Sequence, residues 1–433
     1  MDPQRRVHGA ASARDDVDVD GVSRERFRMV LHAGTASEIA EHDGGHAHGT
    51  RRSQQEPSTP TPAGPTNATA RRLLIAVGAT AGHVYPALAI AEAYRAAHPD
   101  LAVSFAGPDD ALAARLIASR GHRLHTVSSS QLVNVGLGGK LAASGRVLTG
   151  FAQARRLLRD HGARLVLGLG GYASGAILLA ARSLGLRIAI HEANEVPGLA
   201  NRLLAPFAHR VYLASAAAAP AFARSRTLVT GQPVRADIAA LIDLPRPAPE
   251  PSRAIRVLVL SSTRGERFLA ERVPGLLSSL EHHGFAVEAL HQTGQLALDA
   301  VAHAYRGAGV KATVAPYLDE SASAYLWADL VIARAGAGTL AEIAAAGTPA
   351  LLVPLSDASH DHQAANAAAV ATTGAAIAVA ERDWQTEALA ARLAALLEAP
   401  AWSSASAAAR RLARPDAAAR VVADCEALMT GRW

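Results

Sequence analysis

The sequence predicts an α/β protein in which two doubly wound, Rossmann-like parallel sheets, one in each of two domains, face each other across a cleft. Short apolar runs alternate with helix-forming segments from residue 73 onward, which is the pattern of βα repeats. A proline-rich stretch interrupts the alternation once, and the pattern then restarts. Small and polar residues follow several of the apolar runs, at the strand ends where open α/β sheets bind their ligands.

Composition narrows the class of protein before any element is assigned. The chain has 433 residues, half of them apolar, which suits two or three domains with sizeable cores. Cys425 is the only cysteine, so an intrachain disulfide and a cysteine metal site are excluded. No apolar run reaches the roughly 18 residues that cross a bilayer. We also expect no secretory signal in the first residues, where Asp and Arg are interspersed.

Residues 1–70 are expected to form a disordered tail. They mix Gly, Ser, Thr, Pro and His without periodicity, and the prolines between residues 58 and 65 oppose both helix and sheet. The net charge of +5 comes from the remaining residues, because the tail contains more Asp and Glu than Lys and Arg.

Residues 71–239 are expected to form the first domain. Short apolar runs predict buried parallel strands, and the longer segments between them predict helices. The expected strands are 73–77, 101–106, 165–168, 188–191 and 211–214, and the expected helices are 84–97, 109–119 and 174–184.

Residues 240–254 are expected to be a semi-rigid linker because they contain four closely spaced prolines. Residues 255–433 then form the second domain, which includes the C-terminal helices. The alanine-rich runs 364–380 and 388–395 are interpreted as helix-forming sequence. The expected strands are 255–260, 287–291, 313–316, 330–333 and 350–354, and the expected helices are 267–281, 339–346, 361–372 and 386–398.

The first candidate site is the turn from Gly78 to Gly82. It lacks the spacing of a dinucleotide fingerprint, but it leads into a helix whose first N–H groups could bind phosphate. His83 ends the turn. Its ring is either a general base or a packing or capping group, and the segment alone leaves both open.

The second candidate site lies in the second domain. Glu342 either accepts hydrogen bonds from a ribose diol or completes a capping box with Thr339. The cluster of Asp361, His362 and Gln363 matches no strong metal-ligand spacing, so contacts to a sugar are preferred.

The segment from Lys140 to Arg159 is strongly basic and is called the basic segment below. It is either a solvated helix face or a surface for anionic lipid or phosphate, aided by apolar neighbours such as Leu137, Leu148 and Phe151. Nucleic acid is disfavoured because no aromatic platform accompanies the charges.

Several motifs in order resemble the MurG family, the bacterial enzymes that transfer N-acetylglucosamine from UDP-N-acetylglucosamine to undecaprenyl-pyrophosphoryl-muramyl-pentapeptide. The resemblance covers residues from about 73 to about 380. The motifs are His-Val-Tyr-Pro-Ala-Leu-Ala at 83–89, Gly-Gly-Tyr-Ala-Ser-Gly at 170–175, His-Glu-Ala-Asn at 191–194, Gly-Gln-Pro-Val-Arg at 231–235, His-Gln-Thr-Gly at 291–294 and Asp-His-Gln at 361–363.

The resemblance implies a GT-B fold, with the acceptor on the first domain and the UDP-sugar on the second. It implies an inverting reaction without an essential metal or cofactor, at the cytoplasmic face of the membrane. His83 matches the acceptor-side base, and Asn194 and Glu342 match an active-site asparagine and the ribose-binding glutamate. Further substrate contacts are expected from Thr80, Ala81, Gly82, Arg235, Thr263, Arg334, Gly338, Thr339 and Gln363.

Two loops depart from the family's pattern. Ala79 and Ala81 replace glycines of the first loop, and an alanine that needed a positive φ there would cost on the order of 1 kcal/mol. Ser261 and Ser262 replace glycines of the second-domain loop. The departures keep two alternatives open, which are a paralogue acting on another glycolipid and a non-catalytic scaffold that binds UDP-sugar or lipid.

Overall fold

The computed structural model describes residues 72–99, 102–128, 137–261, 267–294, 296, 298–318, 320–355 and 361–432, with only the backbone of residues 137–147, 172 and 361. The expected tail 1–70 lies outside these ranges, so its disorder stays a prediction. Ser262 and Thr263 also lie outside them.

The first sheet is parallel, and its order β3-β2-β1-β4-β5-β6-β7 reverses between β1 and β4. Ile75 on β1 stands opposite Phe105 on one side and Leu167 on the other. This point of reversal is where parallel α/β sheets bind ligands. The strands are β1 (Leu73–Ala76), β2 (Val103–Gly107), β3 (Leu124–Thr126), β4 (Leu165–Gly168), β5 (Arg187–Glu192), β6 (Arg210–Leu213) and β7 (Thr227–Val229).

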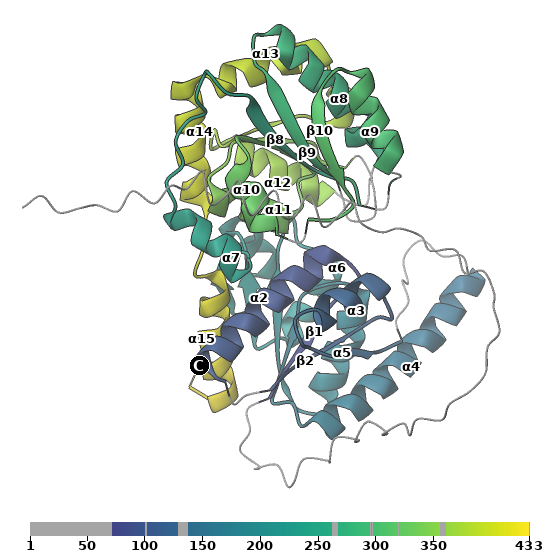
Figure 1. The fold of residues 1–433 in the computed structure, drawn as a ribbon. Helices are drawn as coiled ribbons and strands as arrows, with labels where there is room; N and C mark the ends of the chain where they lie inside the picture. The colour runs from purple at the N-terminus through teal and green to yellow at the C-terminus, as the bar shows by residue number, and fades with distance from the viewer. Residues whose placement is uncertain are drawn as a thin grey trace, which may run out of the picture. The chain divides into compact units, whose positions relative to one another are not determined.

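Both faces of the first sheet are buried, because successive side chains of β1 enter different cores. Leu73 and Ile75 pack with residues of α2 and α3, whereas Leu74 and Ala76 pack with residues of α4 and α5. Figure 1 shows these helices around the sheet. The helices are α2 (Ala81–Ala97), α3 (Ala111–Ala118), α4 (Leu137–His161), α5 (Tyr172–Ser183), α6 (Leu199–Leu204) and α7 (Ala236–Ala239), with 3-10 turns η1 (Ala205–Phe207), η2 (Ala216–Phe222) and η3 (Ala240–Asp243).

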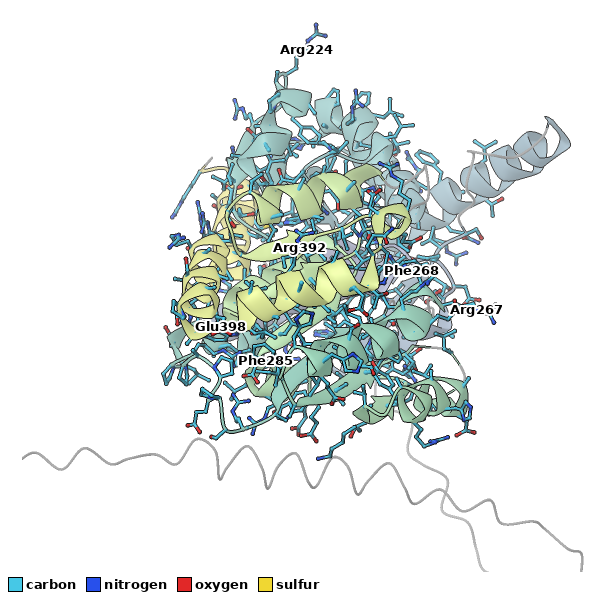
Figure 2. All side chains as sticks on the ribbon, turned by 90° about the horizontal axis from the view of Figure 1, so that it is seen from above. Arg224, Arg267, Phe268, Phe285, Arg392 and Glu398 are labelled. Atoms are coloured by element: carbon cyan, nitrogen blue, oxygen red, sulfur yellow. The ribbon has the colours of Figure 1, made fainter. Side chains whose placement is uncertain are left out.

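The second sheet is also parallel, in the order β10-β9-β8-β11-β12-β13. Phe268 and Phe285 pack at the margin of its main core (Figure 2). The two parallel α/β sheets that the sequence predicts are therefore confirmed. The strands are β8 (Ile255–Leu260), β9 (Val287–Gln292), β10 (Lys311–Ala315), β11 (Leu330–Ala333), β12 (Ala350–Leu352) and β13 (Ala376–Ala378). The helices are α8 (Arg267–His282), α9 (Leu298–Gly307), α10 (Ser321–Trp327), α11 (Ala337–Ala346), α12 (Asp361–Ala371), α13 (Thr386–Leu397), α14 (Ala399–Leu412) and α15 (Ala417–Thr430), with the 3-10 turn η5 (Glu381–Asp383).

One alanine-rich run is not helical throughout. The expected helix 361–372 is confirmed as α12, which ends at Ala371. The helix-favouring run 364–380 continues beyond it, and Ala376–Ala378 forms the edge strand β13. Gly374 has a φ of 82°, which turns the chain out of the helix direction. Pairing with β12 then outweighs the helix propensity of alanine.

The last helix, α15, packs against the first sheet and lies beside α2 (Figure 1). Val421 and Leu428 share a core with Leu73. Asp424 accepts two hydrogen bonds from Arg210, at 2.9 and 3.0 Å. The division into 71–239 and 255–433 stays a prediction, but by its packing α15 belongs with the core of the first sheet.

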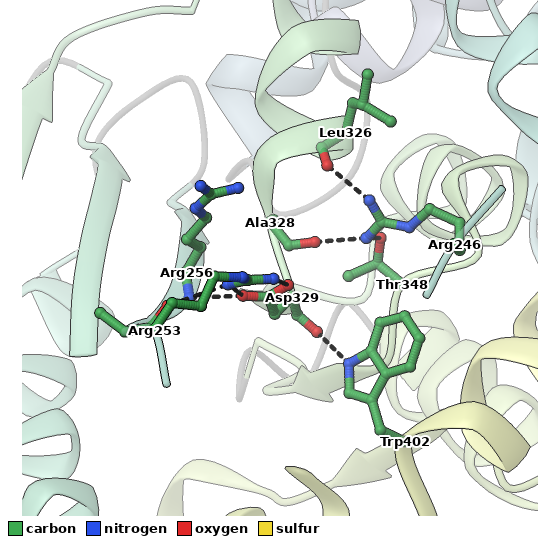
Figure 3. Close-up of polar contacts among 9 residues, drawn as sticks. Arg246, Arg253, Arg256, Leu326, Ala328, Asp329, Thr348 and Trp402 are labelled. Atoms are coloured by element: carbon green, nitrogen blue, oxygen red, sulfur yellow. Dashed lines mark hydrogen bonds and ion pairs between the residues drawn. The ribbon is translucent and has the colours of Figure 1, made fainter. Parts of the chain in front are cut away.

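The proline-rich segment after η3 is tied to the second sheet through Arg246 and Arg253 (Figure 3). The Arg253 guanidinium donates to both carboxylate oxygens of Asp329, at 2.6 and 2.7 Å. The backbone N–H of Arg256 donates to the same carboxylate, and Trp402 donates to the Asp329 carbonyl at 2.7 Å. Arg246 donates to the carbonyls of Leu326 and Ala328 and to the Thr348 hydroxyl.

Asp329→Ala should lower the free energy of unfolding by about 1.5–3 kcal/mol, because it removes charge-assisted hydrogen bonds that fix the linker. Urea denaturation measures the change. Asp383→Ala is the matched control, since Asp383 pairs with Arg382 while its own side chain is 62% exposed. That control should stay within about 0.5 kcal/mol of the wild type. Similar losses in the two variants would contradict the role given to Asp329.

Candidate active site

The helix α2 begins at Ala81, three residues before the expected start at residue 84, so His83 lies in its first turn. Thr80 is the N-cap residue, in extended conformation, and its backbone carbonyl accepts hydrogen bonds from the N–H groups of His83 and Val84. The Thr80 hydroxyl lies 2.9 Å from Nδ1 of His83. The turn after β1 therefore fixes both the backbone and the ring of His83.

The His83 ring packs against glycines from two neighbouring strand ends. A Cβ added to Gly78, after β1, would lie 2.5 Å from Nδ1 of His83. A Cβ added to Gly170, after β4, would lie 3.1 Å from Nε2. Gly170 and Gly171 also have φ of 92° and 83°, which side chains disfavour. The glycines make room for the imidazole at the point where the strand order reverses.

Burial lowers the pKa of His83 to about 4, and the charge of His362 lowers it further. The imidazole is therefore neutral at neutral pH. When Nδ1–H donates to the Thr80 hydroxyl, Nε2 carries no proton and can accept one. The arrangement suits a general base.

The alanine at position 81 needs no left-handed backbone. Ala81 is the first residue of α2 and is buried, whereas Thr80 and Gly82 are exposed beside it. The cost considered for a positive φ at Ala81 therefore does not arise. Thr80 caps α2 and Ala81 and Gly82 begin it, three residues before the expected start at residue 84, so their N–H groups belong to its N-terminal turn.

Asn194 belongs to a buried polar network built around Glu192, at the end of β5. The Glu192 carboxylate accepts from the backbone N–H and the side-chain amide of Asn194, at 3.0 and 3.1 Å. It also accepts from the Gly198 N–H and the Asn201 amide, at 3.0 and 2.8 Å. Four donors thus hold one carboxylate, which fixes the loop after β5.

Asn366 of α12 joins this network and was not among the residues expected in the site. Its Nδ2 donates to Oδ1 of Asn194 at 3.1 Å, and its Oδ1 accepts from the Glu195 N–H at 2.9 Å. The sequence offers one signal for it. Asn366 lies three residues after Gln363, which places both side chains on the same face of a helix.

Glu342 on α11 accepts a hydrogen bond of 2.9 Å from the Tyr325 hydroxyl. The N-cap of α11 is Gly336, so Thr339 lies inside the helix and the capping-box interpretation is wrong. Burial raises the pKa of Glu342, while the charge of Arg235 acts in the opposite direction. The Arg235 guanidinium lies 5.4 Å above the Tyr85 ring and is almost fully buried.

The other residues of the second sheet that are expected to bind substrate differ in their burial and in their contacts. Arg334 is buried, donates to the Val353 carbonyl at 2.9 Å and pairs with Glu381 at 2.6 Å, so its guanidinium braces the chain after β12. Gln363 accepts from the Leu355 N–H at 3.1 Å. Gly338 and Thr339 are partly buried in the first turn of α11. Their contacts with substrate stay predictions, as do those of Thr263.

A second buried network begins at Ser261, which the sequence marks only as a replaced glycine. Its hydroxyl lies 3.0 Å from Nε2 of His291, and Nδ1 of His291 lies 2.9 Å from the Tyr305 hydroxyl. Burial lowers the pKa of His291 to about 4. The serine thus anchors the end of β8 in a way that glycine could not.

Within the described ranges, His, Cys, Asp and Glu side chains do not gather in threes that could hold a metal ion. The same part of the chain contains no helix whose length and apolar character would let it cross a membrane.

Comparison with known proteins matches both sheets to one family. The glycosyltransferase family 28 N-terminal domain matches residues 73–213, and the family's C-terminal domain matches residues 256–421. Two curated relatives carry the name UDP-N-acetylglucosamine–N-acetylmuramyl-(pentapeptide) pyrophosphoryl-undecaprenol N-acetylglucosamine transferase. The one from Magnetococcus marinus is 38% identical over 82% of this chain and 97% of its own. The one from Aeromonas hydrophila is 39% identical over 84% of this chain and 98% of its own.

Solved structures show the same fold. MurG of Acinetobacter baumannii is 29% identical to this chain and has a TM-score of 0.65. The match covers 82% of this chain and 99% of that one. The glycosyltransferase of kitacinnamycin has a TM-score of 0.60, and the match covers 83% of this chain and 99% of that one. Its sequence identity is 16%, so it shows the fold alone.

The stability of the protein should fall as the pH decreases from about 6.5 toward 5. Burial lowers the pKa of His83, His191 and His291 to about 4, below the value of about 6.5 for an unfolded histidine. In this window the unfolded state binds more protons, so acid favours unfolding, and the full stability is present above pH 6.5. Urea denaturation at several pH values measures the slope.

The slope should be shallower in His291→Gln, which loses one of these three imidazoles. His283→Gln is the control because His283 is exposed, and it should keep the wild-type slope. An unchanged slope in His291→Gln would contradict the assignment.

Proposed function

Because the chain belongs to the MurG family of glycosyltransferases, we propose that it moves N-acetylglucosamine from UDP-N-acetylglucosamine to the lipid-linked muramyl-pentapeptide of peptidoglycan synthesis. The family has the GT-B fold, and the two parallel sheets of this chain have it too. The observation that carries the proposal is the neutral His83, held by Thr80 and glycines at the β1–β4 reversal.

On the acceptor side, Nε2 of His83 takes the proton of the attacking sugar hydroxyl. The hydroxyl oxygen forms a bond with the anomeric carbon of N-acetylglucosamine, and the bond from that carbon to the UDP oxygen breaks. Attack opposite the leaving group inverts the anomeric configuration. The ring is neutral before it receives the proton, as a general base must be.

On the donor side, the Glu342 carboxylate accepts hydrogen bonds from the ribose diol, and Tyr325 holds that carboxylate in place. Arg235 stabilises the negative charge of the departing diphosphate. It is given this role because its positive charge acts on Glu342, the residue given to the ribose. The N-terminal turn of α11, with Gly338 and Thr339, would favour the same charge. In this proposal Gln363 contacts the donor sugar, and Arg334 and Thr263 are further substrate-binding residues.

The acceptor carries a long lipid, so we place the protein at the cytoplasmic face of the membrane as a peripheral enzyme. Arg156 and Arg159 are exposed on α4, and the side chain of Leu148 is 69% exposed on the same helix. Arg155 lies 5.9 Å from the Phe151 ring. The side chains of Lys140, Arg146 and Leu137 lie outside the described part of the chain.

Glu342→Ala should weaken UDP binding about 10- to 150-fold, because losing a charge-assisted hydrogen bond costs about 1.5–3 kcal/mol. Titration calorimetry with UDP measures the effect. Glu271→Ala is the control, since the Glu271 side chain is 66% exposed on α8. Unchanged UDP affinity in Glu342→Ala, with a lowered melting temperature, would give Glu342 a structural role only.

His83→Ala should lower kcat about 10²- to 10⁴-fold, the usual contribution of a general base. Affinity for UDP should stay within about twofold, because Arg235, Glu342 and Gln363, which are given to the donor, all lie outside α2. UDP release with UDP-N-acetylglucosamine and a short-chain lipid-linked muramyl-pentapeptide measures the rate. Equal turnover in wild type and variant would remove His83 from the mechanism. A wild type that binds UDP without any turnover would favour the scaffold.

Substitution of Arg155, Arg156 and Arg159 by Ala should weaken binding to anionic vesicles roughly 100-fold, because each charge contributes about 1 kcal/mol. Co-sedimentation with phosphatidylglycerol-containing vesicles, at low and high salt, measures binding. The matched control replaces Arg224, Arg267 and Arg392, which are exposed elsewhere (Figure 2). Equal losses in both triple variants, or binding that ignores salt, would contradict a role for the basic segment.

A further inference from the structure

Tyr85 stands on α2, two residues after His83, and its ring has a different set of neighbours. Residues two apart on a helix do not face each other. The His83 ring packs against glycines at the β1–β4 reversal, whereas the Tyr85 ring packs at the margin of the first core and lies beneath the guanidinium of Arg235. The guanidinium carbon is 5.4 Å from the ring centroid. Through Tyr85, α2 therefore reaches the cation that is proposed to meet the diphosphate.

The contact between Tyr85 and Arg235 joins a cation to a neutral ring. Burial raises the pKa of Tyr85, and although the charge of Arg235 acts in the opposite direction, the hydroxyl keeps its proton at neutral pH. A guanidinium within about 6 Å of an aromatic centroid is attracted by the negative face of the ring. The attraction is stronger where water is excluded, and Arg235 is only 4% exposed.

An aromatic ring holds a guanidinium by its face and leaves the N–H groups at its edge available. Nε of Arg235 is buried and has no hydrogen-bond partner among the described residues. Asp237 lies 3.7 Å from this nitrogen, beyond hydrogen-bond distance, and its side chain is 48% exposed. A carboxylate in direct contact would instead occupy the N–H groups and offset the positive charge. The ring therefore supports Arg235 while leaving it able to bind an anion.

The surroundings of this contact connect it to the donor side of the site. Besides burial, the charge of Glu342 raises the pKa of Tyr85, and against burial, the charge of Arg235 lowers that of Glu342. The helix α2 also packs beside α7, which follows Arg235, and beside α11, which carries Glu342. Tyr85 is thus the part of α2 that meets the residues given to the donor, while His83 is given to the acceptor.

We propose that Tyr85 is a positioning residue for the leaving group, whose ring holds the Arg235 guanidinium so that its N–H groups bind the diphosphate of UDP. This inference rests on the proposed function, which gives Arg235 to the diphosphate. It requires the aromatic ring of Tyr85 and not its hydroxyl. It also requires that the ring contributes to binding of the diphosphate and not of the uridine.

The test uses Tyr85→Leu, which keeps an apolar side chain at the margin of the core and removes the ring. The Kd for UDP should rise about 5- to 30-fold, the contribution of a cation–π contact with a largely desolvated guanidinium. The Kd for uridine, which lacks the diphosphate, should stay within about twofold. Tyr85→Phe keeps the ring, so both affinities should equal those of the wild type. Titration calorimetry measures UDP binding, and competition with UDP measures uridine binding.

Phe285→Leu is the matched control, because Phe285 packs at the margin of the core of the second sheet, and it should bind UDP like the wild type. In an Arg235→Ala background, Tyr85→Leu should change the Kd for UDP less than about twofold, because the group that it positions is absent. An unchanged Kd for UDP in Tyr85→Leu, equal losses of UDP and uridine affinity, an equal loss in Tyr85→Phe, or effects that multiply in the double variant would each overturn the proposal.

The wild type tests the proposed function separately. If it binds UDP but shows no turnover with a lipid-linked acceptor, the proposed transfer is overturned, and the UDP and uridine affinities still decide the role of Tyr85. If it does not bind UDP, the proposed donor site and the role of Tyr85 are both overturned.

Discussion

The common direction of the strands is the constraint on which the site depends. In each sheet every strand runs the same way, so their carboxyl ends lie at one edge. The segments that follow these strand ends contain His83 and Asn194 in the first sheet and lead to Glu342 in the second. Chemistry gathers there because the backbone N–H groups and helix starts at that edge are not used inside the sheet.

Electrostatics divides the site into a neutral part and a charged part. Burial keeps His83 neutral, and glycine backbones lie against its ring. Arg235 is almost fully buried, and its charge acts on the partly buried Glu342, so neither charge stands alone. The proposed base and the groups proposed to meet the charged leaving group therefore have separate environments.

Most of the fold follows from the sequence because its strands are short apolar runs that periodicity detects. The strands 165–168, 255–260 and 330–333 have the expected bounds. The short strands β3 and β7 were not anticipated, since three residues carry too little pattern. β13 was missed because alanine favours helices unless a neighbouring strand offers pairing.

Residues of the candidate site that belong to a local sequence motif could be predicted. Residues that depend on contacts with distant parts of the chain could not. His83 and Glu342 stand in recognisable local patterns. Asn366 is an ordinary helical asparagine until α12 meets the loop after β5, which lies 171 residues earlier in the chain. The role of Ser261 likewise depends on its hydrogen bond with His291, on the neighbouring strand.

The packing of α15 on the first sheet has a consequence for how the protein is made. The core that begins with Leu73 is completed by Val421, Cys425 and Leu428, which are almost the last residues of the chain. During synthesis, the whole second sheet emerges before the first sheet can bury that face. The N-terminal half therefore keeps this part of its apolar surface uncovered until the last helix has been made.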